Sequence, residues 1–167
     1  MKKNIIYAIV LFFAIVLQTS VLKLIAPTSV VGDIVLMLVL AGAIIDGFFS
    51  FFWLAVFFGI VYDLVGYVQV GSHAIVFLLI VYFVSFFSRR FSVELGGVGL
   101  VWFFFFVVFA TILSNGTMAF LVAFDLQNFN TYFKEFGSFK NIFIQIFYNV
   151  FLFLISFVVL KKIKKHL

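Results

Sequence analysis

The sequence has no cysteine and only one proline among its 167 residues. Without cysteine there can be no disulfide, no thiol nucleophile and no thiolate metal site. Charged residues are also scarce, at 10% of the chain, whereas hydrophobic residues make up 66%. A soluble domain of this length cannot bury so much apolar surface. The composition therefore indicates an integral membrane protein whose solvent is the lipid bilayer.

The few charges are mostly positive, with 11 lysines and arginines against 6 acidic residues. A net charge of +5 could suggest nucleic-acid binding. The basic residues, however, cluster at the ends of apolar segments, where they orient helices in a membrane. We therefore expect membrane lipid as a partner and no nucleic acid.

Six apolar stretches predict six helices in a single integral membrane domain that covers residues 1–167. The predicted ranges are approximately 5–25, 33–46, 48–64, 72–88, 98–124 and 139–160. The first stretch resembles a secretory signal peptide, but it continues to Ile25 without a clear small-residue cleavage site. It is therefore interpreted as an uncleaved transmembrane helix.

The placement of lysine and arginine favours six crossings over five. With six, the basic residues at both ends of the chain and the Arg89-Arg90 pair lie on the cytoplasmic side. With five, that pair and the C-terminal lysines would face outward, against the positive-inside tendency. We expect a multi-pass protein of the bacterial cytoplasmic membrane with both termini in the cytoplasm.

The second and third helices are short for a bilayer that about 20 residues span. Whether both cross fully is left open by their length. We expect them to meet in a tight cytoplasmic turn at Asp46-Gly47, with Asp46 solvated and the second helix partly shielded by protein. Asp33 begins the second helix, where a carboxylate is expected to cap free amides.

One face of the predicted third helix combines small residues with an acid. Its members are Ala55, Gly59, Tyr62, Asp63 and Gly66. Small residues allow close approach of a neighbouring helix in lipid. A carboxylate near membrane depth costs about 2.5–3.5 kcal/mol and normally has a partner, for which His73 is a candidate. We expect this face to serve helix packing or partner contact, with a proton-relay or substrate role for Asp63 as the alternative.

Two further polar faces follow along the chain. The sixth helix carries Asn141, Gln145, Tyr148, Asn149 and Ser156, and the fifth carries Thr111, Ser114, Asn115 and Met118. Polar side chains facing lipid would be unsatisfied, so both faces should point into the bundle or towards a partner. Either they hydrogen-bond to each other, or they line a ligand pocket or partner contact.

The connection between the fifth and sixth helices has an aromatic pattern. One helical face holds Leu126, Phe129, Tyr132, Phe133 and Phe136. This suits a short amphipathic helix in the outer membrane interface, and Phe129, Phe133 and Phe136 are then candidates for partner contact. An ordinary belt of interfacial aromatic residues is the alternative.

No catalytic constellation is present in the sequence. The two histidines, His73 and His166, are expected on opposite sides of the membrane, so they cannot share a metal. No glycine-rich phosphate loop precedes a lysine, and no serine has a base nearby in sequence. We therefore expect neither enzyme activity nor a cofactor.

The chain resembles the rod shape-determining protein MreD family. The likeness covers nearly the whole length and is concentrated in residues 14–90. It is carried by Leu17-Gln18, Ala26-Pro27, Asp33, the stretch Gly59-Ile60-Val61-Tyr62-Asp63-Leu64-Val65-Gly66, Gly71-Ser72-His73-Ala74, Tyr82 and Arg89-Arg90. Two positions depart from the family pattern, since Gly32 stands where members often have proline and Ala55 where they have glycine.

The resemblance implies an all-α membrane protein, a six-transmembrane-helix bundle resembling the substrate-binding subunits of energy-coupling-factor transporters. It implies a non-enzymatic scaffold of the cell-wall elongation complex that binds MreC. Through MreC it would regulate RodA and a penicillin-binding transpeptidase in peptidoglycan synthesis, and MreB indirectly. The alternative is a vitamin-binding subunit of such a transporter. In that case the helix-docking Ala-x-x-x-Ala motif of those subunits is missing, since Ala8 and Ala14 are six apart.

Overall fold

A computed structural model describes residues 2–22, 32–67, 69–88, 98–125, 136 and 139–166. This part of the chain is helical throughout apart from short turns, and its elements match the six predicted ranges, of which residues 23–25 lie outside the described part. In chain order they are α1 (Lys2–Val16), the π-helix η1 (Leu17–Leu22) that continues it, α3 (Ile34–Asp46), α4 (Phe48–Gly66), α5 (Ser72–Ser88), α6 (Val98–Asp125) and α8 (Phe139–Lys165). The last helix extends one turn further than the sequence predicted.

Four apolar segments in the described residues are long enough to cross a membrane. They are Lys3–Ser20, Phe48–Gly66, Gly99–Phe124 and Phe139–Lys165. The remaining helices are shorter, with 13 residues in α3 and 17 in α5. Length and composition thus indicate a membrane protein.

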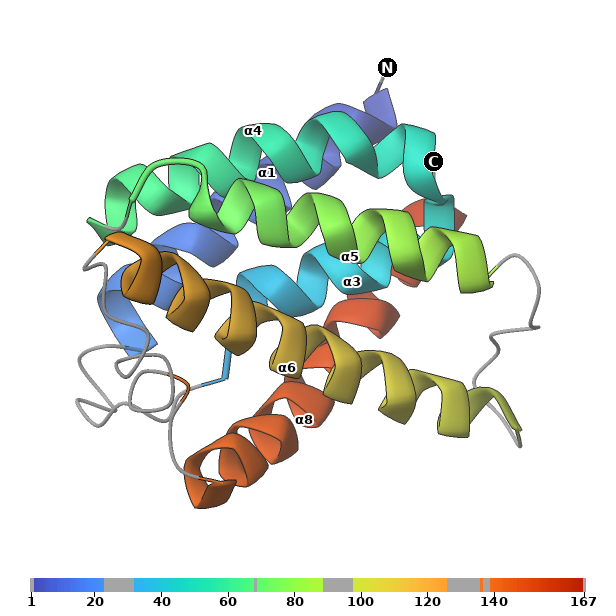
Figure 1. Ribbon diagram of the computed structural model, residues 1–167. Helices are drawn as coiled ribbons and strands as arrows, with labels where there is room; N and C mark the ends of the chain where they lie inside the picture. The colour runs from blue at the N-terminus through green and yellow to red at the C-terminus, as the bar shows by residue number, and fades with distance from the viewer. Residues whose placement is uncertain are drawn as a thin grey trace.

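The short helix α3 forms the centre of the bundle. All nine residues from 35 to 43 are buried, and α3 contacts α1, α4, α5, α6 and α8. Figure 1 shows it enclosed by longer helices. A helix that is apolar on every side needs such an enclosure or lipid, and here protein supplies it. The expected shielding of this helix is therefore present.

The turn between α3 and α4 lies against the ends of two other helices. Gly47 makes the turn with a φ of 78°, a value that favours glycine. The Asp46 carboxylate lies 3.0 Å from Lys3 Nζ and 2.9 Å from Lys164 Nζ, and its side chain is only 3% exposed. Lys164 also donates to the Ile45 carbonyl at 2.8 Å. The prediction that Asp46 is solvated was wrong, because α1 and α8 bring two amines to it.

The ion pairs of Asp46 bring the end of α3 next to the start of α1 and the end of α8. The start of α1, the end of α8 and the α3–α4 turn lie together at one end of the bundle, and the turn between α4 and α5 lies at the opposite end (Figure 1). The α3–α4 connection thus shares an end with the first and last helices.

Candidate functional site

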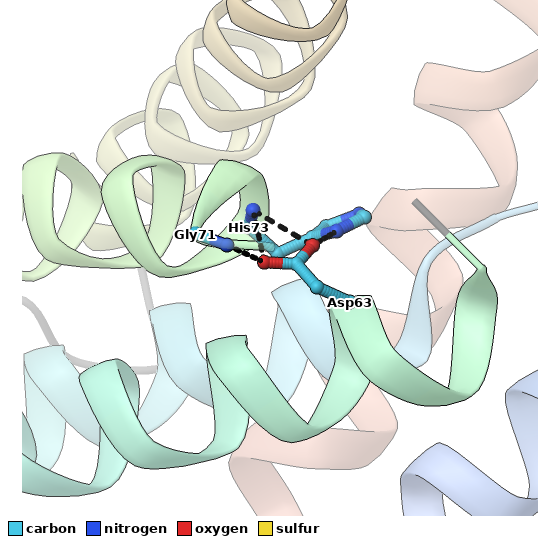
Figure 2. Close-up of polar contacts among 3 residues, drawn as sticks. All are labelled: Asp63, Gly71 and His73. Carbon is cyan, nitrogen blue, oxygen red and sulfur yellow. Dashed lines mark hydrogen bonds and ion pairs between the residues drawn. The ribbon is translucent and has the colours of Figure 1, made fainter. Parts of the chain in front are cut away.

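Asp63, Gly71 and His73 form a compact polar contact between α4 and α5, here called the Asp63 clasp (Figure 2). The Asp63 carboxylate is fully buried. It accepts from the Gly71 amide at 2.7 Å and from the His73 amide at 3.1 and 3.2 Å. His73 Nδ1 lies 2.6 Å from Asp63 Oδ1. The predicted polar neighbour of Asp63 is therefore its actual partner.

The clasp follows from where the two helices end and begin. Asp63 lies in the last turn of α4, while Gly71 and His73 are at the start of α5, where backbone amides have no partner within the helix. A carboxylate there satisfies those donors and lies favourably near the positive end of the helix dipole. Asp63 thus acts as the N-terminal cap of the following helix.

Two residues in the connecting turn adopt left-handed backbone conformations. Tyr67 has a φ of 54°, and its amide bonds to the Asp63 carbonyl at the end of α4. Gly71 has a φ of 100°, which a residue with a side chain rarely adopts. These conformations direct the chain back so that the start of α5 faces the Asp63 carboxylate.

One helical turn before Asp63, at Gly59, α4 approaches α5 closely. A Cβ atom on Gly59 would lie 2.5 Å from the Ala74 Cα, so only glycine fits without separating the helices. Next to it the Tyr62 and His73 rings lie 4.4 Å apart, centroid to centroid. Tyr62 also stacks on Phe77 at 6.3 Å. Small and aromatic residues together join the two helices.

The predicted face of the third helix therefore lies mostly inside the chain. Ala55, Gly59, Tyr62 and Asp63 are buried, and Gly66 is partly exposed. Buried residues pack helices of their own chain and are not available to a partner in this conformation. Of the aromatic candidates, Phe136 is partly buried, and Phe129 and Phe133 lie outside the described residues.

A second polar cluster surrounds the start of α3. Asn149 Nδ2 donates to Thr111 Oγ1 at 2.9 Å, and its Oδ1 accepts from the Asp33 amide at 2.8 Å. The Asp33 carboxylate accepts from the Leu36 amide at 2.9 Å, which confirms its predicted capping role. Because Asn149 and Thr111 are near the middle of α8 and α6, α3 begins inside the bundle.

Gln18 completes this cluster from the η1 segment. Its Nε2 donates to the Gly32 carbonyl and its Oε1 accepts from the Ile34 amide, both at 3.0 Å. Burying an unpaired backbone group costs about 1–3 kcal/mol, so each of these bonds stabilises the entry of α3 into the bundle. From the sequence, Gln18 was named only as part of the family resemblance, although an amide side chain inside an apolar stretch was a signal for such a role.

The other polar residues of α6 and α8 also meet each other. Asn115 Nδ2 donates to Gln145 Oε1 at 2.7 Å, and both side chains are partly buried. Asn141, one helical turn before Gln145, is partly exposed. Of the two alternatives for these faces, the hydrogen bonds of Asn115, Gln145 and Asn149 agree with the first, in which polar side chains join helix to helix.

Three comparisons, with protein-family models, with curated protein sequences and with solved structures, gave no match. Membership of the MreD family, which the sequence motifs suggest, therefore stays a prediction.

The chemistry open to the Asp63 clasp follows from its contacts. A histidine oriented by a carboxylate is half of a general-base arrangement, which also needs a nucleophile or a substrate proton within reach. Among the described residues, the His73 ring contacts Asp63, Tyr62 and Phe77, and it interacts electrostatically with Asp33. Among the described residues, no group of three or more metal-ligating side chains gathers there or elsewhere. The hydrogen bonds of the clasp join the end of α4 to the start of α5.

Proposed function

We propose that this chain is a non-enzymatic scaffold of the bacterial cell-wall elongation complex, of the MreD type. It would bind an MreC-like protein with a single transmembrane helix, and through it influence RodA, the penicillin-binding transpeptidase and, indirectly, MreB. The observation that carries the proposal is the Asp63 clasp. The stretch that most resembles the family, Gly59–Gly66 with Gly71–His73, is the one whose residues join α4 to α5.

Six crossings are part of the proposal. If only the four long segments crossed, the α3–α4 turn would lie on the side of the membrane opposite to both chain ends. The Asp46 ion pairs with Lys3 and Lys164 instead hold this turn beside the first and last helices. This supports a crossing by α3, and then by α5, with both chain ends on the cytoplasmic side, where lysines accumulate.

A partner's transmembrane helix needs an exposed apolar surface that its side chains can fit. A groove of about 580 Å³ lies between α5 and α6. Its lining residues are all apolar: Phe83, Val84, Phe87, Val101, Trp102, Phe105, Phe106 and Phe109. We expect the helix of the MreC-like partner to pack there, since the residues of the Asp63 clasp are covered by their own chain.

The vitamin-transporter alternative has less support. It would use the polar faces of α6 and α8 as a pocket. In these faces Asn149 is hydrogen-bonded to Thr111, and Gln145 is hydrogen-bonded to Asn115. These side-chain amides therefore already have partners within the chain and are less available to a ligand.

Site-specific photo-crosslinking tests the proposal. The protein would be co-expressed with the MreC-like protein of the same genome, with a photoreactive amino acid at Phe105 in the groove or at Trp53 on the outer face of α4. These side chains are 51% and 74% exposed. We expect an adduct from position 105, identified by mass spectrometry as the MreC-like protein, and little from position 53.

Two results would contradict the proposal in different ways. An adduct from Trp53 alone would place the contact elsewhere and remove the groove from the account. No adduct from either position, together with no co-purification of the MreC-like protein in mild detergent, would contradict the scaffold function itself.

A further inference from the structure

A second groove lies between the first turns of α1 and the last turns of α8. It has a volume of about 380 Å³, within the range of about 300–1,000 Å³ typical of ligand pockets. Its lining residues are Ile6, Val159, Lys162, Ile163 and His166. The groove thus combines an apolar wall with two groups that can carry a positive charge.

The residues of this groove are arranged in order along α8. Val159, Lys162, Ile163 and His166 follow the pattern i, i+3, i+4 and i+7, which places them on one helical face. The apolar residues Val159 and Ile6 lie nearer the membrane interior, while Lys162 and His166 are at the end of the helix. This is the order in which a phospholipid presents its acyl chain and its phosphate.

The basic residues at the end of α8 differ in what they contact. Lys164 is held by Asp46 and by the Ile45 carbonyl, and the Lys161 amine lies 5.9 Å from the centre of the Phe157 ring. Lys162 is exposed and, within the described segments, has no ion-pair partner. Its charge is therefore available to a ligand in the groove.

We infer that this groove binds an anionic phospholipid of the cytoplasmic leaflet. The phosphate would lie between Lys162 and His166, and an acyl chain would run along Ile6, Val159 and Ile163. Basic residues beside a membrane attract anionic lipid by about 1 kcal/mol each, and the apolar wall adds a contact that diffuse attraction lacks. This inference rests on the membrane topology proposed above, in which both chain ends are cytoplasmic, and does not depend on the MreC-like partner.

Native mass spectrometry of the intact protein in detergent tests the inference, with added phosphatidylglycerol or phosphatidylcholine as the probe. Wild type should retain phosphatidylglycerol in preference to phosphatidylcholine. Lys162→Gln should reduce this retention about ten-fold or more, because it removes a direct charge-assisted contact with the phosphate in addition to the diffuse attraction. Lys165→Gln removes the same charge from the same turn at a residue that does not line the groove. It loses the diffuse attraction alone, so retention should fall about five-fold or less.

A second variant distinguishes lipid binding in the groove from attraction by charge alone. Val159→Trp keeps every charge and fills the apolar wall, so it should also reduce phosphatidylglycerol retention. Equal losses in Lys162→Gln and Lys165→Gln, with none in Val159→Trp, would overturn the inference in favour of diffuse attraction. Equal retention of the two lipids by wild type would overturn it as well.

Discussion

At the scale of single residues, Asp63 combines two tasks that usually fall to different groups. Its carbonyl takes part in ending α4, and its carboxylate caps the start of α5. A buried carboxylate is tolerated because it accepts from two amides and contacts an imidazole. Its burial is thus explained by the contacts it makes within its own chain.

Replacing Asp63 by alanine tests this explanation. The change leaves the Gly71 and His73 amides and the His73 ring without their buried acceptor, so we expect the free energy of unfolding to fall by about 3 kcal/mol. Thermal unfolding in detergent micelles would measure the loss. Leu64→Ala is the matched control, since Leu64 is adjacent and 59% exposed. Equal stability of the two variants would contradict the capping role.

The sequence allowed part of this site to be predicted. An acid in an apolar run needs a partner, and His73 was the candidate named from the sequence, which the structure confirms. The two backbone amides that bind the carboxylate could not be predicted, because their availability depends on where α5 begins and on the left-handed conformation of Gly71.

At the scale of elements, α4 and α5 form a closely packed antiparallel pair. Their separation is limited at Gly59, which faces the backbone of Ala74. In lipid, where the hydrophobic effect does not drive helices together, such close van der Waals contact is a main source of association.

Gly59→Ala is expected to lower stability, because its Cβ would lie 2.5 Å from the Ala74 Cα and 2.7 Å from the Ala74 nitrogen. Overpacking of this kind typically costs about 1–3 kcal/mol. The obstructing atoms are backbone atoms, so adding Ala74→Gly should not restore the thermal unfolding midpoint. Full rescue by that second change would show that the helices are not in backbone contact there.

Helix ranges were predictable because apolar runs and turn residues are local signals. The start of α3 inside the bundle was not, because it depends on Asn149, a residue 116 positions away in sequence. The burial of Asp46 is similar, since Lys164 comes from the far end of the chain. Local sequence patterns do not predict which residue, far away in the sequence, will contact a given side chain in the folded protein.

At the scale of the whole molecule, Asp46 links three helices. Its carboxylate holds Lys3 of α1 and Lys164 of α8 against the end of α3. With the central position of α3, these contacts define which helix ends share a side of the bundle. The membrane topology proposed above depends on this arrangement.

Single-cysteine labelling tests the proposed topology most directly, and the absence of native cysteine means that no background site has to be removed. Cysteines would replace Ser50 at the start of α4, Gln69 in the α4–α5 turn and Lys165 at the end of α8. A membrane-impermeant maleimide would be applied to intact cells and to inverted vesicles. The six-crossing account predicts labelling of positions 50 and 165 from the cytoplasmic side only, and of position 69 from the outside only. Labelling of position 50 from outside and of position 69 from the cytoplasm, as four crossings would require, would contradict it.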